Sequence, residues 1–155
     1  APGTFTQVMS GQIDVGWAGA PFGVDAVEQG RTRVVAKSSD DPVLDRQTIR
    51  LLIANSNEMA KRPDVFVRFM RAYRESLAWV YSTPEGLTAY AKWANISETT
   101  AKRSLAEFLP KQAVDPDRIS GVDDVMADAV TFKYIPAPLS KQQIDELIQI
   151  PERKQ

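Results

Sequence analysis

The sequence predicts an α/β fold, because three short apolar segments with strand-like patterns come before a long series of helix-like segments. The strand-like segments are residues 13–17, 32–36 and 48–54, all in the first part of the chain. From residue 56 onward the apolar side chains recur at helical spacing. Three strands are few for a complete sheet, so we expect part of a larger protein to be missing from this sequence.

Length and composition are those of one soluble globular domain, with 155 residues of which 43% are hydrophobic and 25% are charged. The 19 Lys and Arg nearly balance the 20 Asp and Glu, so no overall charge draws the chain to nucleic acid. No apolar run is long enough to insert into a membrane. The absence of Cys and His removes thiol nucleophiles, imidazole bases and the zinc sites built from them. We therefore expect no cofactor, no metal and no enzymatic activity.

The elements expected in the first third alternate between helix and strand. Gly11 and Gly30 each follow a helical pattern and are residues that commonly end a helix. The segment 48–54 is apolar on both faces, which is typical of a strand inside a covered sheet. The order is a helix over residues 4–10, a strand over 13–17, a helix over 25–29, and strands over 32–36 and 48–54.

Capping residues and prolines mark the helices of the remaining chain. Ser140 and Gln143 have the spacing of a capping box. The long helix that follows Pro63 places aromatic and aliphatic side chains on one stripe and leaves Arg68, Arg71 and Arg74 for solvent. Helices are expected to start at Ser56, Pro63, Pro84, Ser97, Gly121 and Ser140, the last one running through Ile150.

Several landmarks follow one another in a recognisable order. Ser10-Gly11-Gln12-Ile13-Asp14 comes first, then Gly30-x-x-Arg33, the strand-like 49–54, Arg62-Pro63-Asp64, and Thr83-Pro84-Glu85. In this order they resemble the C-terminal half of the solute-binding proteins that serve ABC importers of nitrate, sulfonates, taurine and thiamine pyrimidine precursors. The resemblance covers essentially the whole chain.

The resemblance implies a two-lobed, type II periplasmic binding-protein-like fold with a helix-rich C-terminal portion and the solute between the lobes. Residues 1–36 would complete the smaller lobe, 37–42 would form the hinge, and 43–155 would be the C-terminal part of the larger lobe. The N-terminal half, which would supply the other wall of the cleft, would be missing. The resemblance also implies a periplasmic or lipid-anchored extracytoplasmic location and ABC permease subunits as partners.

In the resembled family the loop after the first strand faces the cleft, which points here to Trp17, Ala18, Gly19, Ala20 and Pro21. Small residues expose backbone N–H donors that can bind an oxyanion, and an indole adds a flat stacking surface. The alternative is a Trp packed in a lobe core beside a tight turn. Ser38 and Asp40 at the hinge are further candidates, although such a polar run is usually a solvated loop.

Other residues have structural interpretations. Asp14 is expected to stabilise a turn, and Arg50 to form a salt bridge inside its strand. Trp79, Tyr90 and Trp93 recur at helical spacing and are expected to pack between helices, with contact to a permease as the alternative.

The resulting functional hypothesis is a solute-binding component of an ABC importer that captures a small anionic solute, such as a sulfonate or an aromatic carboxylate. Two alternatives stay open: an enzyme like the thiamine pyrimidine synthase, which uses a histidine that this chain lacks, and an effector-binding domain of a transcriptional regulator. Strands without sheet partners also lead us to expect a dimer that exchanges elements between copies.

Overall fold

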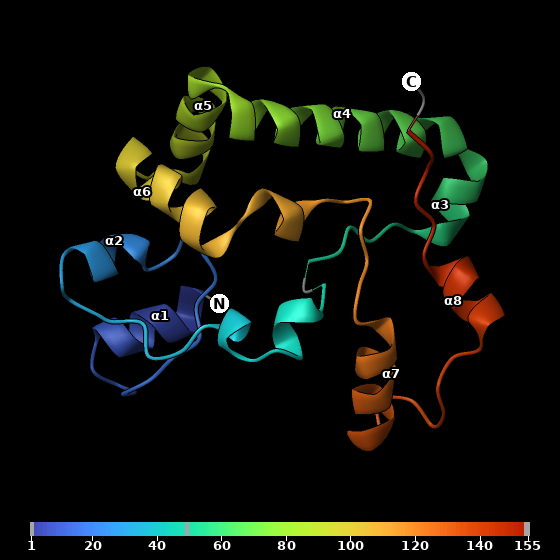
Figure 1. Cartoon of the computed structure of the whole chain (residues 1–155), viewed down its shortest axis with the longest axis horizontal. Helices are drawn as coiled ribbons and strands as arrows, with labels where there is room; N and C mark the ends of the chain where they lie inside the picture. Colours follow the sequence, from blue (N-terminus) through green and yellow to red (C-terminus); the bar gives the residue numbers. More distant parts are fainter. Residues whose placement is uncertain (1, 49, 154–155) are drawn as a thin grey trace. The chain divides into compact units, whose positions relative to one another are not determined.

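A computed structural model describes residues 2–48 and 50–153 of the chain (Figure 1). The backbone forms two compact units, so each is described by itself. One helix, α4 (Pro63–Ser82), contributes its first part to the second unit and its last part to the first. The first unit comprises Ala1–Ala36 and Glu75–Val114, and the second comprises Lys37–Arg74 and Asp115–Gln155.

The first unit contains the core of the described chain. Its helices α2 and α5 both pack against α6, and the residues between them are mostly small, which lets the helices approach closely. The buried apolar residues are Val24, Ala26, Ala91, Ala101 and Leu109. The elements are α1 (Pro2–Met9), α2 (Val24–Glu28), the end of α4, α5 (Pro84–Ala94), α6 (Glu98–Arg103), a π-helical turn η3 (Ser104–Phe108) and a 3₁₀ turn η4 (Lys111–Val114).

A polar link joins α2 to α6 in this unit. The Glu28 carboxylate accepts a hydrogen bond of 3.0 Å from the buried Thr100 hydroxyl. The Arg103 guanidinium lies 3.9 Å from the same carboxylate. The Glu28 carboxylate therefore gives the buried Thr100 hydroxyl a hydrogen-bond partner at the place where α2 and α6 meet.

The junction of α4 and α5 depends on a glycine. A Cβ atom at Gly86 would lie 2.4 Å from the carbonyl oxygen of Trp79, closer than any side chain tolerates. The missing side chain lets the first turn of α5 rest on the last turns of α4, so that α5 leaves the end of α4 at a sharp corner (Figure 1).

The second unit is held mainly by polar links among its described residues. Thr48 donates its N–H to the Ser120 carbonyl at 3.0 Å and accepts from the Ser120 N–H at 2.9 Å through its hydroxyl. Gly121, at φ +74°, approaches Gln47 so closely that a Cβ atom would lie 2.7 Å from the Gln47 Cγ. The elements are η1 (Ser38–Asp40), η2 (Leu44–Arg46), α3 (Ser56–Lys61), the start of α4, α7 (Val122–Thr131) and α8 (Lys141–Leu147).

Arg74 does not face solvent as the helical pattern predicted. Its side chain is only 13% exposed, because it pairs with Asp117 at 2.6 Å and also donates to the Pro151 carbonyl. Arg153 donates to the other oxygen of Asp117. This cluster of one carboxylate and two guanidiniums ties α4 to the segments on both sides of α7 and α8.

The three predicted strands are not formed: residues 2–48 and 50–153 contain no β-strand, so the α/β class is not confirmed. Residues 13–17, 33–36 and 51–54 run as irregular chain instead. The physical reason is that a strand is stabilised by a neighbouring strand, and no two of these segments form a ladder. Ile49, part of the third predicted strand, lies outside the described residues.

The predicted helix starts are largely confirmed. Thr83 caps α5 by accepting the Gly86 N–H at 3.0 Å, and Ser97 caps α6 in the same way with the Thr100 N–H. Ser140 and Gln143 form both bonds of the capping box, although α8 ends at Leu147 rather than at Ile150. The prediction that Ser56 caps α3 is wrong, because Asn55 accepts the Glu58 N–H.

Candidate functional site

The predicted binding loop begins where α1 ends. Gly11 adopts φ +73° and donates its N–H to the Val8 carbonyl, while Gln12 donates to the Gln7 carbonyl at 2.9 Å. These two bonds form a Schellman motif, so Gly11 ends the helix as its sequence position predicted. The chain then turns back along the helix that it has just left.

Two contacts hold the returning chain against α1. A Cβ atom at Gly16 would lie 2.9 Å from the Val8 side chain and 3.0 Å from the Thr4 carbonyl, so only glycine allows this approach. The Thr4 hydroxyl donates a hydrogen bond to the Trp17 carbonyl oxygen. The backbone of Trp17 is thereby fixed to the helix, while its side chain is left free to point outward.

The indole of Trp17 is 67% exposed, so it is not packed in a core. Val15 and Phe22, on either side of it in sequence, are exposed as well. The alternative interpretation, a structural Trp beside a tight turn, does not describe this conformation. An exposed aromatic flanked by exposed apolar side chains is typical of a surface that contacts another molecule.

The backbone beyond the indole offers unused hydrogen-bond donors. Within the described structure, the N–H groups of Ala18, Gly19 and Ala20 have no intramolecular acceptor. The turn is closed instead by carbonyls: Phe22 donates to the Gly19 oxygen at 3.1 Å, and Val24 donates to the Pro21 oxygen at 3.3 Å. The Ala20–Pro21 peptide bond is cis. We call residues 17–21 the Trp17 loop.

Ser38 and Asp40 belong to the second unit and lie in η1. Both are exposed, and the Asp40 carboxylate accepts the Lys37 N–H at 2.7 Å. That bond is a local turn contact of the kind expected for a solvated polar loop. A joint site of these residues with the Trp17 loop stays a prediction.

The other singled-out residues are mostly exposed. Asp14 and Arg50 have no ion-pair partner in the described part of the chain. Trp93 is 81% exposed and stacks on Tyr90 of its own helix with ring centroids 6.2 Å apart. The expectation that it packs between helices is therefore wrong, because its neighbour lies three residues away on α5.

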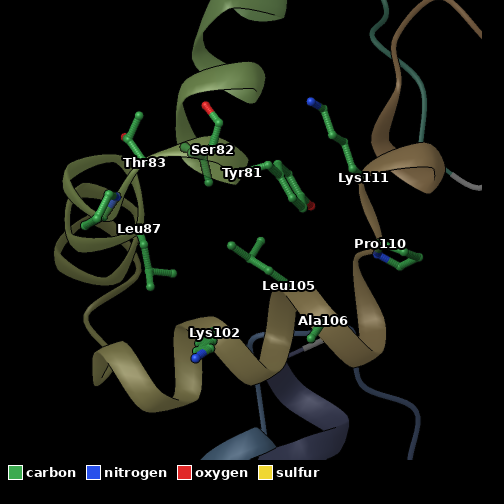
Figure 2. Close-up of a pocket in the computed structure, with 11 residues that line it drawn as sticks. Tyr81, Ser82, Thr83, Leu87, Lys102, Leu105, Ala106, Pro110 and Lys111 are labelled. Carbon is green, nitrogen blue, oxygen red and sulfur yellow. The ribbon is translucent and has the colours of Figure 1, made fainter.

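A concave surface that the sequence did not indicate lies elsewhere in the first unit. It has a volume of about 600 Å³ and lies between the end of α4, the start of α5, and α6 with the residues that follow it (Figure 2). We call it the α4–α6 pocket. No spacing in the sequence could have revealed it, because its lining comes from separate elements. Its lining is Val80, Tyr81, Ser82, Thr83, Pro84, Leu87, Lys102, Leu105, Ala106, Pro110 and Lys111.

Comparison with known proteins identifies the family. Residues 2–87, more than half of the chain, match the model of the NMT1/THI5 like family. The chain therefore belongs to this family, which is periplasmic binding-protein-like. Its domain is found in solute-binding proteins of ABC transporters and in proteins of thiamine synthesis. No curated protein and no solved structure matches the chain.

The matched range includes the Trp17 loop and ends inside α5, before the lysines of the α4–α6 pocket. The family is usually extracytoplasmic. None of the helices described here is both long and apolar enough to cross a membrane.

Proposed function

We propose that this chain is the solute-binding component of an ABC importer and that the Trp17 loop contacts the solute. One observation carries the proposal: the exposed indole of Trp17 stands next to three backbone N–H groups, of Ala18, Gly19 and Ala20, that have no acceptor within the described structure. Unused amides can hold an anionic oxygen, and an indole can stack on a flat or aliphatic body. Family membership supports a solute-binding role.

The solute class that fits this loop is a small anion with an apolar part, such as a sulfonate or an aromatic carboxylate. The loop provides donors and apolar surface but no side-chain charge between Val15 and Phe22. A cation would find no partner there. A fully polar anion would bind the N–H groups but not the indole, whereas an organic anion would contact both.

Import would follow from closure of two lobes on the solute, which permease subunits then detect. We propose that residues 1–36 belong to the smaller lobe, 37–42 to the hinge and 43–155 to the larger lobe, in a protein located outside the cytoplasm. The change of unit after Ala36 supports a hinge at this point. The first unit also includes residues 75–114, so the lobes and the units differ in extent.

We also propose that the chain binds its solute without converting it. The sequence contains no His and no Cys, the side chains that most often act as general base or thiol nucleophile. A recovered, unmodified solute after incubation would agree with this proposal, and a released product would contradict it.

The test uses Trp17 as its own reporter. Trp79→Phe with Trp93→Phe leaves Trp17 as the sole indole, and the fluorescence of this variant is followed during titration with taurine, benzenesulfonate, benzoate, nitrate and an aminopyrimidine. We expect a saturable change with at least one of these solutes. The matched control keeps only Trp93, the exposed indole of α5, and should not respond. A flat response from Trp17 to every solute, or an equal response from Trp93, would contradict the proposal.

A further inference from the structure

We propose that the α4–α6 pocket is a second small-molecule site, which binds an amphiphilic anion: a carboxylate or similar anionic head on an aliphatic body. The pocket's volume of about 600 Å³ falls in the range of ligand sites in proteins. It is separate from the Trp17 loop, none of whose residues line it. The kind of ligand that the pocket binds depends on which of its hydrogen-bond donors are still unused.

The three hydroxyl groups in the lining have already donated their protons to backbone carbonyls. Tyr81 donates to the Leu109 oxygen. Ser82 donates to the Ala78 oxygen at 2.6 Å, and Thr83 donates to the Trp79 oxygen at 3.1 Å. Each hydroxyl has a single proton, so none of them can donate to a neutral polar ligand without breaking a bond of the fold.

The side-chain donors that remain are the ammonium groups of Lys102 and Lys111. Figure 2 shows these two side chains coming from different elements, Lys102 from α6 and Lys111 from the segment after Pro110. Neither lysine has an ion-pair partner among the described residues. No Asp or Glu lines the pocket, and the nearby Glu107 is paired with Arg103 at 2.9 Å. Two unneutralised positive charges therefore select an anion.

The rest of the lining is apolar. Leu87 from α5 and Leu105 from η3 both extend into the space between the helices in Figure 2. Val80 of α4 also lines the pocket. These three side chains are half-buried, so a ligand's hydrocarbon part would cover apolar surface that is now in contact with water. An anionic head at either lysine and an aliphatic body over the leucines meet both requirements.

The π-helical turn η3 explains how the pocket is shaped. Leu109 donates its N–H to the Ser104 carbonyl, five residues earlier, at 3.0 Å. This wider turn places Leu105 and Ala106 in the lining while it directs Leu109 into the core. Single π-helical turns inside or after α-helices are found frequently at functional sites.

The test measures binding of sodium octanoate to the whole chain by calorimetry, and of 1-octanol as the uncharged probe of the same length. We expect saturable binding of octanoate at this pocket, at least tenfold tighter than octanol and weaker at higher salt. Lys102→Gln with Lys111→Gln should reduce octanoate affinity at least tenfold, and each single change by a smaller factor. Lys92→Gln removes an exposed lysine of α5 that does not line the pocket and should have no effect.

The location is checked with the methyl NMR signals of Leu87 and Leu105, which should shift on addition of octanoate. Three results would overturn the proposal: octanol binding as tightly as octanoate, the double lysine variant binding like the unchanged chain, or leucine methyl signals that do not move. Trp17→Ala should leave the octanoate-induced shifts of the Leu87 and Leu105 methyl signals unchanged, because Trp17 does not line the pocket. This control separates the two sites, so a failure of the Trp17 loop proposal leaves the result for the α4–α6 pocket interpretable.

Discussion

The guanidinium of Arg74 donates two hydrogen bonds to the same carboxylate oxygen of Asp117, from Nε at 2.8 Å and from Nη2 at 2.6 Å. Nη2 also donates to the Pro151 carbonyl at 2.5 Å. One arginine thus connects helix α4 to two segments of the second unit that are 43 and 77 residues away in sequence. Since no apolar residue of this unit is buried among those described, we expect the arginine to contribute strongly to its stability.

Arg74→Ala is predicted to lower the free energy of unfolding by about 1–3 kcal/mol, because it removes the charged donor from one Asp117 oxygen and from the Pro151 carbonyl and leaves Asp117 paired with Arg153 alone. Arg74→Lys should recover only part of this loss, because an ammonium cannot reproduce the fork of N–H groups. The measurement is urea unfolding followed by circular dichroism.

The matched control for this prediction is Arg68→Ala on the same helix. Arg68 pairs with Asp64 at 3.2 Å, but both side chains are exposed, and such a pair contributes less than about 1 kcal/mol. An equal loss of stability in the Arg68 and Arg74 variants would contradict the prediction that the contact of Arg74 with Asp117 stabilises the second unit more than a surface ion pair does.

The stability of the chain is predicted to fall at acidic pH. Burial by itself would raise the pKa of Asp117, but hydrogen bonds from Arg74 and Arg153 and their positive charges lower that pKa below its usual value. A carboxyl whose pKa is lower in the folded state stabilises the fold above its unfolded pKa, and this contribution disappears as the pH falls through the folded pKa. The loss should therefore occur below about pH 4.

Thermal unfolding between about pH 6 and pH 2 measures this dependence. Asp117→Asn should be less stable near neutral pH and should show a smaller loss on acidification than the unchanged chain. Asp14→Asn, which removes an exposed carboxylate that has no ion-pair partner among the described residues, should leave the profile as it is. Part of the dependence should persist in every variant, because backbone hydrogen bonds from Leu44 and Val43 lower the pKa of Asp41 as well. An unchanged profile in Asp117→Asn would refute the assignment.

Gly86→Ala is predicted to destabilise the first unit by about 3 kcal/mol, the upper range for overpacking. The new Cβ atom would lie 2.4 Å from the Trp79 carbonyl oxygen and 2.8 Å from the Val80 Cα, and backbone atoms cannot move aside as a side chain can. Gly3→Ala provides the control, since nothing lies within 4 Å of its Cβ position in helix α1. There alanine should be neutral or stabilising. Chemical denaturation of both variants decides the matter, and a neutral Gly86→Ala would show that α4 and α5 do not meet as described.

Local signals in the sequence predicted the helices well. Thr83, Ser97 and the Ser140–Gln143 pair act as caps, and Gly11 ends α1, because each of these bonds joins residues only three to five positions apart. Such bonds are determined by the nearby residues themselves. The conformation of Trp17 is less local, since its backbone is held by the Thr4 hydroxyl, 13 residues earlier in the chain.

Features that depend on distant residues could not be predicted in this way. The helical stripe assigned Arg74 to solvent, and only the fold brings Asp117 and Pro151 to it. The α4–α6 pocket combines residues from α4 to η4 for the same reason. The predicted strands did not form for the same reason. Apolar alternation indicates that a segment could pair in a sheet, but the pairing also needs a second strand beside it.

The unpaired apolar segments predict self-association of the chain. Within the described structure, the N–H and C=O groups of residues 33–36 and 51–54 make no backbone bonds, and Ile53 is 93% exposed. A segment with free backbone groups and exposed β-branched side chains can add a strand from a second copy.

We expect light scattering after size exclusion to show dimers or larger species that increase with concentration. Ile53→Lys should shift the distribution toward monomer, because a charge on an edge opposes pairing. Val125→Lys changes an exposed valine of helix α7, whose backbone is already bonded, and should not. Monomers at every concentration, or equal effects of the two lysines, would refute association through these segments.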